Sequence, residues 1–284
     1  MNKSDTTPAI PSIPSIHPLA ALLRGFAVDF ITGHNLEIVE RIMAPEYCLS
    51  IGGYLLNGRD TEYLTPTAAQ INQFPGLAVT VHDVVYGENS IAMQFTEHGC
   101  SPADQNRGAT WRGITMFRTD GERLRWGWAE EDYFARKRQL TSGICDAVDA
   151  PHSAPWDVQP GVSNSALEAL ARDWLDTPAN LFQLEGAFWL SSVSADDPHP
   201  ASLIDVDHVE VDELFSADDR VVFHGLYHGR YKGGFKGVDE DRIGRPIILR
   251  AAGILTFGGS ELVAAAVTVD RLGLNRALCF SYVG

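Results

Sequence analysis

Basic residues are scarce in this sequence. Its 284 residues include 22 Lys and Arg against 37 Asp and Glu, and the formal net charge is −15. Binding to nucleic acid or to an anionic membrane surface requires clustered Lys and Arg. We therefore expect neither nucleic acid nor a membrane among the partners of the chain.

Long apolar runs and export signals are also lacking. No stretch approaches the ~20 apolar residues that a membrane-spanning helix needs, and the N-terminus has no basic segment followed by an apolar core. The four cysteines, Cys48, Cys100, Cys145 and Cys279, do not have the spacing of a metal or redox motif. The expectation is a cytoplasmic protein with reduced thiols.

Cofactor and metal motifs are absent as well. The sequence contains neither a Gly-rich phosphate-binding loop nor a Gly-x-Ser-x-Gly nucleophile motif. His224 and His228 are four residues apart, but on a strand this separation is about 13 Å, too far to chelate one ion. Residues 196–199 include two Asp and one His, for which a solvated acidic loop is the simpler interpretation. We expect no cofactor and no metal.

One stretch near the middle of the chain occurs a second time near its end. Three pairs of identical residues are separated by 138 positions: Asp132 and Asp270, Arg138 and Arg276, and Leu140 and Leu278. Elsewhere the offset changes only where hairpin loops are expected, which indicates a diverged tandem duplication. The predicted organisation is a flexible arm over residues 1–17, a first domain over 18–143, a linker over 144–163 and a second domain over 164–284.

Each half begins with helical periodicity and continues with strand periodicity. In the first half the pattern predicts helices over 18–32, 36–43 and 59–74, then strands over 78–85, 90–99, 110–118 and 124–133. The second half repeats the plan with a helix over 165–175, a helical region reaching residue 190, and strands near residues 208, 221, 247 and 262. Helices followed by an antiparallel meander predict an α+β fold. Because both faces of the strand around Ile114 and Phe117 are apolar, the sheets of the two halves are expected to pack together as an intrachain pseudo-dimer.

The last predicted strand of the first half carries aromatic and acidic residues at period two. Trp126, Trp128, Glu130 and Asp132 would leave the same face of a strand. This pattern indicates an aromatic cavity with an acidic end, and the alternative is an edge strand whose acids are solvated.

A second acid comes from the strand over 90–99. Glu97 shares its face with Ile91, Met93 and Phe95, so it is expected to point toward the core, although a bulge would bring His98 inward instead. Glu97, Glu130 and Asp132 are thus predicted to share one cavity, where burial would raise their pKa values into the range of a general base. A solvated acidic rim is the alternative.

These features resemble the nuclear-transport-factor-two-like fold and, within it, the SnoaL-like polyketide cyclases. The first half ends its last strand with Trp126, Trp128, Asp132 and Gln139-Leu140, and the second half has Asp270 and Arg276-Ala277-Leu278. The family's Gly-x-His-x-Gly turn corresponds to residues 229–233, with Tyr231 at the His position, whereas the first half has neither residue there. The resemblance implies two cone-shaped α+β barrels with helices packed on a curved antiparallel sheet. It also implies cofactor-free aldol chemistry by an Asp acid/base, at Asp132 and Asp270.

Two classes of function fit the sequence. The first is a cofactor-independent lyase or isomerase that acts on an apolar aromatic or polycyclic molecule by aldol or retro-aldol chemistry, dehydration or isomerisation. Deformylation of lignin-derived diaryl compounds is a variant that the resemblance implies. The second class is a non-catalytic small-molecule-binding or scaffold pseudo-dimer. A small hydrophobic ligand and a homodimer of tandem chains are the expected partners.

The candidate residues follow from these patterns. The catalytic candidates are Glu97, Asp132, Glu130 and His98; the candidates for ligand contact are Trp111, Trp126, Trp128, Tyr54, Phe26 and Asp29. The counterparts in the second domain are Asp270, Tyr231 and Tyr227. By the offset of 138, Thr268 and Ala266 replace Glu130 and Trp128, so the first half is predicted to be the active one.

Overall fold

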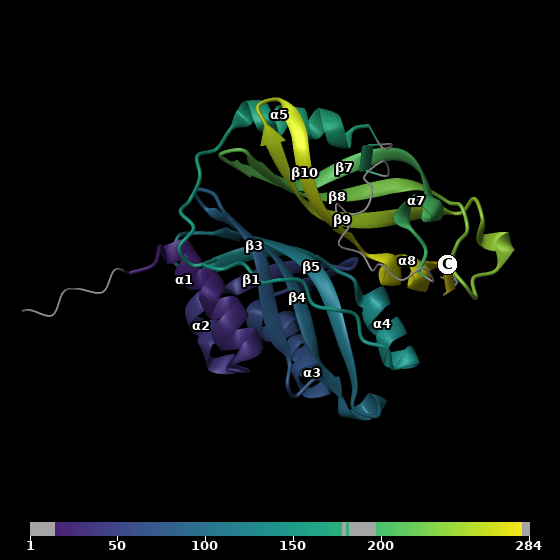
Figure 1. The fold of residues 1–284 in the computed structure, drawn as a ribbon, viewed down its shortest axis with the longest axis horizontal. Coiled ribbons are helices and arrows are strands. Elements are labelled where there is room, and N and C mark those ends of the chain that lie inside the picture. The colour runs from purple at the N-terminus through teal and green to yellow at the C-terminus, as the bar shows by residue number, and fades with distance from the viewer. Residues whose placement is uncertain (1–14, 178–179, 182–196, 280–284) are drawn as a thin grey trace, which may run out of the picture.

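The computed structural model describes residues 15–177, 180–181 and 197–279, which form two sheets with helices around them (Figure 1). The arm predicted over residues 1–17 lies almost wholly outside the described residues, and so does most of the helical region predicted up to residue 190. The predicted domain boundaries stay a prediction. None of the described helices is long and apolar enough to cross a membrane.

The first half contains a six-stranded sheet. Its helical elements are α1 (Pro18–Arg24), the π-helical η1 (Gly25–Thr32), η2 (Leu36–Ile38), α2 (Val39–Ile42), the π-helical η3 (Arg59–Tyr63), α3 (Leu64–Gln73), η4 (Pro102–Asp104) and α4 (Tyr133–Ser142). Its strands are β1 (Met43–Ile51), β2 (Tyr54–Asn57), β3 (Ala78–Tyr86), β4 (Ser90–Ser101), β5 (Arg107–Thr119) and β6 (Leu124–Glu131). The strand order is β2-β1-β6-β5-β4-β3, with β1 and β6 parallel and the other pairs antiparallel.

The second half contains a four-stranded antiparallel sheet in the order β10-β9-β8-β7. Its strands are β7 (Ile204–Ala217), β8 (Arg220–Tyr231), β9 (Pro246–Gly258) and β10 (Glu261–Val269). Its described helices are α5 (Ser165–Leu175), α7 (Pro200–Leu203), η6 (Glu240–Arg242) and α8 (Arg271–Cys279). The helix predicted over 165–175 has these bounds.

Sequence signals explain where the first helix begins and what it buries. Pro18 occupies the first helical position, where its missing N–H costs no hydrogen bond, and the side chain of His17 accepts a hydrogen bond from the Leu19 backbone N–H. One side of α1 and η1 is apolar and packs against the concave face of the first sheet, and Leu23 and Phe30 are fully buried there. The helices α1, α2 and α3 cover this face in Figure 1.

Each sheet has one face that its helices do not cover, and these two faces pack against each other. Ile114 and Met116 of β5 belong to one buried apolar cluster with Val222 of β8 and Ile254 of β9, and the two sheets face each other in Figure 1. Each sheet is therefore covered on both faces, by helices on one and by the other sheet on the second. The predicted fold, a tandem α+β pseudo-dimer within one chain, is confirmed.

The last strand of the first half is shorter than predicted. The sequence pattern predicted a strand over 124–133, but β6 ends at Glu131 and α4 begins at Tyr133. Asp132 lies between them as the N-terminal cap of α4, and its carboxylate accepts a hydrogen bond from the Ala135 backbone N–H at 3.2 Å. A carboxylate at this position satisfies one of the free N–H groups of the first turn, so the chain turns into a helix there.

Candidate active site

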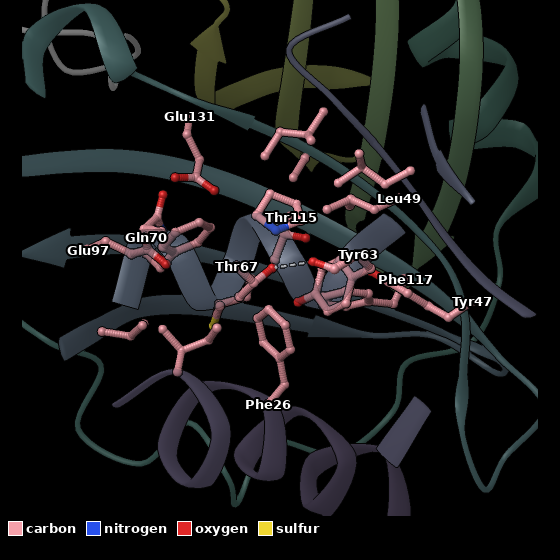
Figure 2. Close-up of a pocket in the computed structure, with 18 of the residues that line it drawn as sticks. Phe26, Tyr47, Leu49, Tyr63, Thr67, Gln70, Glu97, Thr115, Phe117 and Glu131 are labelled. Carbon is pink, nitrogen blue, oxygen red and sulfur yellow. Dashed lines mark hydrogen bonds between the residues drawn. The ribbon is translucent and has the colours of Figure 1, made fainter. Parts of the chain in front are cut away.

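A cavity of about 140 Å³ lies between the concave face of the first sheet and the helices that cover it. Most of its wall is apolar, with aromatic rings from Phe26, Tyr47, Tyr63 and Phe117, as Figure 2 shows. Glu97, Gln70 and Glu131 lie together at one end (Figure 2). The cavity is thus an apolar chamber with a polar end.

Two carboxylates from neighbouring parts of the sheet define this end. Glu97 of β4 and Glu131 of β6 are 5% and 8% exposed. Gln70 Nε2 donates a hydrogen bond to Glu97 Oε2 at 2.7 Å, and Trp111 Nε1 donates one to Glu131 Oε2 at 2.8 Å. Tyr133 also forms a hydrogen bond with Glu131, so side chains at this end of the cavity hold both carboxylates in place.

Burial and mutual repulsion change the acidity of the pair. The pKa of Glu97 is raised well above the usual carboxyl value, first by burial and then by the charge of Glu131. The pKa of Glu131 is raised by burial, which outweighs a hydrogen bond to Tyr133 and the charge of Arg136. Two carboxylates in an apolar setting oppose each other's ionisation, so the two groups titrate as a pair.

Arg136 connects the polar end to the aromatic side chains around it. Its guanidinium lies 4.9 Å from the centre of the Trp111 ring and 4.3 Å from that of Tyr133. Arg136 Nη1 also donates a hydrogen bond to Gln70 Oε1 at 3.0 Å. This bond fixes the orientation of the Gln70 amide, so that its nitrogen faces Glu97.

Gly113 makes room for the pair on the strand between them. A Cβ atom added to Gly113 would lie 2.6 Å from Phe95 Cζ and 2.9 Å from Glu131 Cγ. Because Gly113 pairs with Phe95 on one side and with Glu131 on the other, any side chain here would displace the carboxylate.

The sequence matches no protein-family model and no curated protein. Several solved structures each resemble about half of the chain. A candidate polyketide cyclase from Acidithiobacillus ferrooxidans aligns with 47% of this chain and 99% of its own, at 19% identity and a TM-score of 0.41. A candidate SnoaL-like polyketide cyclase from Shewanella denitrificans covers 44% of this chain and 97% of its own, at 14% identity and a TM-score of 0.40. An NTF2-like protein from Cytophaga hutchinsonii covers 40% and 98%, at 12% identity and a TM-score of 0.34. The neighbours are thus SnoaL-like and nuclear-transport-factor-two-like proteins, as the sequence resemblance predicted.

Three residues predicted from the sequence lie at or beside the cavity. Glu97 and Phe26 line it, and Trp111 is buried behind it, hydrogen-bonded to Glu131. His98 points to the other face of β4, where its Nε2 is 3.0 Å from Thr80 Oγ1. No bulge interrupts the pairing of β4 with β5 there, so His98 is not brought inward.

The prediction that Glu97, Glu130 and Asp132 share one cavity is wrong. Glu130 faces the second sheet, where its Oε1 is 3.0 Å from His224 Nε2. Asp132 Oδ2 accepts a hydrogen bond from Arg271 Nη2 of the second half at 2.6 Å. Both carboxylates are buried, but each pairs with a residue of the other half: Glu130 with His224, and Asp132 with Arg271.

The remaining predicted ligand contacts also lie elsewhere. Trp126 and Trp128 pack in the cluster between the sheets, with their ring centres 5.6 Å apart. Tyr54 is 60% exposed in β2, and Asp29 lies 3.7 Å from Arg24 on the surface. None of the four lines the cavity.

The second-domain candidates are buried in a different setting. Tyr227 and Tyr231 belong to the apolar core of the second half, where the Tyr231 hydroxyl accepts a hydrogen bond from the Phe235 N–H at 3.0 Å. Asp270 caps α8 by accepting a hydrogen bond from the Gly273 N–H at 2.7 Å. Within the described residues, no group of three or more His, Cys, Asp or Glu side chains could hold a metal ion.

Four residues at the polar end were missed by the sequence analysis: Glu131, Tyr133, Gln70 and Arg136. Glu131 is adjacent to Glu130 in the sequence and therefore faces the opposite side of β6. Gly113, a residue with no side chain on the neighbouring strand, was the available signal that something large occupies that side. Gln70 and Arg136 come from helices whose placement on the sheet the strand pattern does not give.

Proposed function

We propose that the first half is a cofactor-independent acid/base enzyme that acts on a small, largely apolar carbonyl compound. The observation that carries the proposal is the Glu97 and Glu131 pair at the polar end of the apolar cavity. Raised pKa values make carboxylates useful for proton transfer near neutral pH. The similar solved structures include candidate polyketide cyclases, which supports small-molecule chemistry of this general kind.

With one shared proton, the two carboxylates have complementary roles. The ionised member removes a proton from the carbon beside the carbonyl group, and the protonated member donates a hydrogen bond to the carbonyl oxygen, on which negative charge develops. The enol or enolate then either takes a proton back at another carbon, which is isomerisation, or attacks a second carbonyl, which is an aldol step. In both cases the removed proton is returned, so no external oxidant or reductant is required.

The size of the cavity limits the substrate. A cavity of about 150 Å³ is large enough to hold benzene, and this cavity has about 140 Å³. One ring or a chain of similar volume fits inside, whereas a diaryl or polycyclic molecule would have to extend beyond it. We therefore favour a one-ring substrate over the diaryl variant. The cytoplasmic location and the homodimer stay predictions.

The proposal is tested without knowing the natural substrate. The protein is incubated in D₂O with phenylacetone or cyclohexanone, and deuterium incorporation beside the carbonyl is followed by NMR. We expect exchange faster than in the protein-free buffer. If the ketones bind but exchange no faster than in buffer, the enzyme proposal fails and the binding-module alternative is favoured.

Gly113→Ala provides a geometric test. Because a Cβ atom at Gly113 would lie 2.9 Å from Glu131 Cγ, the carboxylate has to move, and a misplacement of about 1 Å can cost ~10²-fold in rate. We expect a decrease of this order in the exchange rate. Gly76→Ala is the matched control, because a Cβ atom there meets no atom within 4 Å. Equal rates for both variants would contradict the assigned role of Glu131.

A further inference from the structure

The two halves differ at the place where their last helix meets the sheet edge. In the first half, Gln139 of α4 is fully buried. It forms hydrogen bonds with the part of β5 that extends beyond the end of β6 and is therefore a free edge. Its Oε1 accepts hydrogen bonds from the Thr110 N–H at 3.0 Å and the Asp146 N–H at 2.9 Å, and its Nε2 donates to Thr110 O at 2.6 Å. One amide side chain thus satisfies both backbone groups of an edge residue.

One pair of hydrogen bonds identifies the equivalent positions in the second half. The Asp132 N–H donates to Arg112 O at 2.8 Å, and the Asp270 N–H donates to Arg250 O at 3.0 Å. The ends of β5 and β9 therefore correspond at an offset of 138. By this offset Ile248 corresponds to Thr110. Gln139 corresponds to Ala277, which has no group that could form the same bonds.

The sheet pairing leaves the backbone of Ile248 open. In an antiparallel ladder, residues two apart direct their N–H and C=O groups to the same side. Arg250 O bonds on the β10 side, so the Ile248 groups point to that side too. The pairing of β10 with β9 ends at Ala251. In the described part of the chain, neither Ile248 group has a partner on that side.

A groove of about 550 Å³ lies at this edge, between β9 and α8. Ile248, Leu274, Ala277 and Leu278 supply apolar surface. Its polar lining consists of Asp207, His208, His228, Arg245 and Arg250. The groove therefore combines an open strand edge, apolar walls and more cationic than anionic side chains.

The cationic side chains have unused donors. Arg245 Nη1 is buried and has no hydrogen-bond partner among the described residues. Arg250 forms no hydrogen bond through its guanidinium in the same part of the chain, although it lies beside Gly53 and close enough to Asp270 to affect its pKa. His228 stacks on His208 with ring centres 4.5 Å apart, and its Nε2 is 3.4 Å from Glu210 Oε2. A buried donor without an acceptor destabilises the folded protein. A ligand that brings a hydrogen-bond acceptor into the groove would therefore bind favourably.

We propose that this groove binds an organic carboxylate with an apolar body. The carboxylate accepts hydrogen bonds from Arg245, Arg250 and the Ile248 N–H, and the apolar body lies against Leu274 and Leu278. Guanidinium–carboxylate bonds are charge-assisted and directional, and the apolar walls favour such an acid over inorganic phosphate. This site is separate from the cavity of the first half and does not depend on the function proposed for it.

The test uses the full chain and 4-phenylbutyrate as the probe, with its neutral amide and inorganic phosphate for comparison, by isothermal titration calorimetry. Because bonds to a charged group contribute more than neutral ones, we expect the acid to bind at least ~10-fold more tightly than the amide or phosphate. Arg245→Gln should weaken binding by about 10-fold. Failure of the acid to bind, or equal binding of acid and amide, would overturn the proposal.

Ala277→Gln is the decisive variant. It restores the side chain that closes the edge in the first half, so it should abolish binding without removing any charge. Cys279→Gln adds the same side chain at an exposed position of α8 outside the groove, and it should bind as the unmodified protein does. Binding that survives Ala277→Gln in a folded protein, checked by thermal unfolding, would locate the acid elsewhere and overturn the proposal.

Discussion

Glu97→Gln and Glu131→Gln are each expected to lower the rate of carbon-bound proton exchange by ~10²–10⁴-fold, the usual contribution of a positioned acid or base. The amide keeps the shape of the side chain but can neither remove nor carry the shared proton. Exchange rates by NMR at saturating ketone, with the unfolding midpoint as a check on folding, give the measurement.

Glu130→Gln is the matched control for this experiment. Glu130 is the same residue type one position from Glu131, but it faces His224 and the second sheet. We expect its exchange rate to stay within a few-fold of that of the unmodified protein. If Glu130→Gln loses as much activity as Glu131→Gln, the chemistry is not located in the cavity of the first half.

The pH dependence follows from the same pair. The pKa values of both Glu97 and Glu131 are raised, mainly by burial. The base has to be ionised, so the rate should fall as pH decreases through a value above the usual carboxyl range. The rate should also fall at higher pH once the second proton leaves. The expected profile is bell-shaped, and its two apparent pKa values belong to the pair.

The second large effect is on stability. His224→Leu is expected to destabilise the protein by about 3–5 kcal/mol, because it removes one partner of a buried ionic contact and leaves the other. His224 is fully buried between Glu130 of the first half, at 3.0 Å, and Asp212 of β7, at 3.1 Å. Denaturation by urea, followed by circular dichroism, measures the free energy of unfolding.

The double variant Glu130→Met with His224→Leu distinguishes the buried charge from simple loss of packing. Replacing both partners of a buried pair by apolar residues is often neutral or stabilising, so the double variant should regain most of the loss. A double variant as unstable as His224→Leu alone would mean that packing, rather than charge, accounts for the effect.

The same contact makes stability depend on pH. Burial raises the pKa of Glu130 to about 7. Burial alone would lower the pKa of His224, but hydrogen bonds to Asp212 and Glu130 outweigh it and raise the value to about 9. A group whose pKa is raised on folding stabilises the protein below its unfolded pKa, and this stabilisation is lost as pH rises through the folded value. The unmodified protein should therefore lose stability between about pH 5 and 9, and the double variant should lose much less.

The sequence allowed the fold to be predicted, and it allowed one of the two carboxylates of the proposed site to be found. Period two correctly grouped Trp126, Trp128 and Glu130 on one face of β6, because side chains alternate on any strand. It could not show which face is the concave one, because the sheet is covered on both sides and both faces are apolar. For β4 the contrast between Phe95 and His98 indicated the inner face, and Glu97 was placed in the cavity. For β6 the large indoles favoured the wrong face, and Glu131 was missed.

The contacts between the sheets have a consequence for how the protein responds to dilution. In a symmetric dimer both subunits use the same surface for the interface, so each contact occurs twice, once in each direction. Here Glu130 contacts His224, and Asp132 contacts Arg271. Among the described residues, neither contact has a second copy in which the equivalent positions of the two halves are exchanged. Because both partners belong to one chain, their association does not depend on protein concentration. Each half is therefore free to change its own surface, so one can retain the acids while the other develops a different groove.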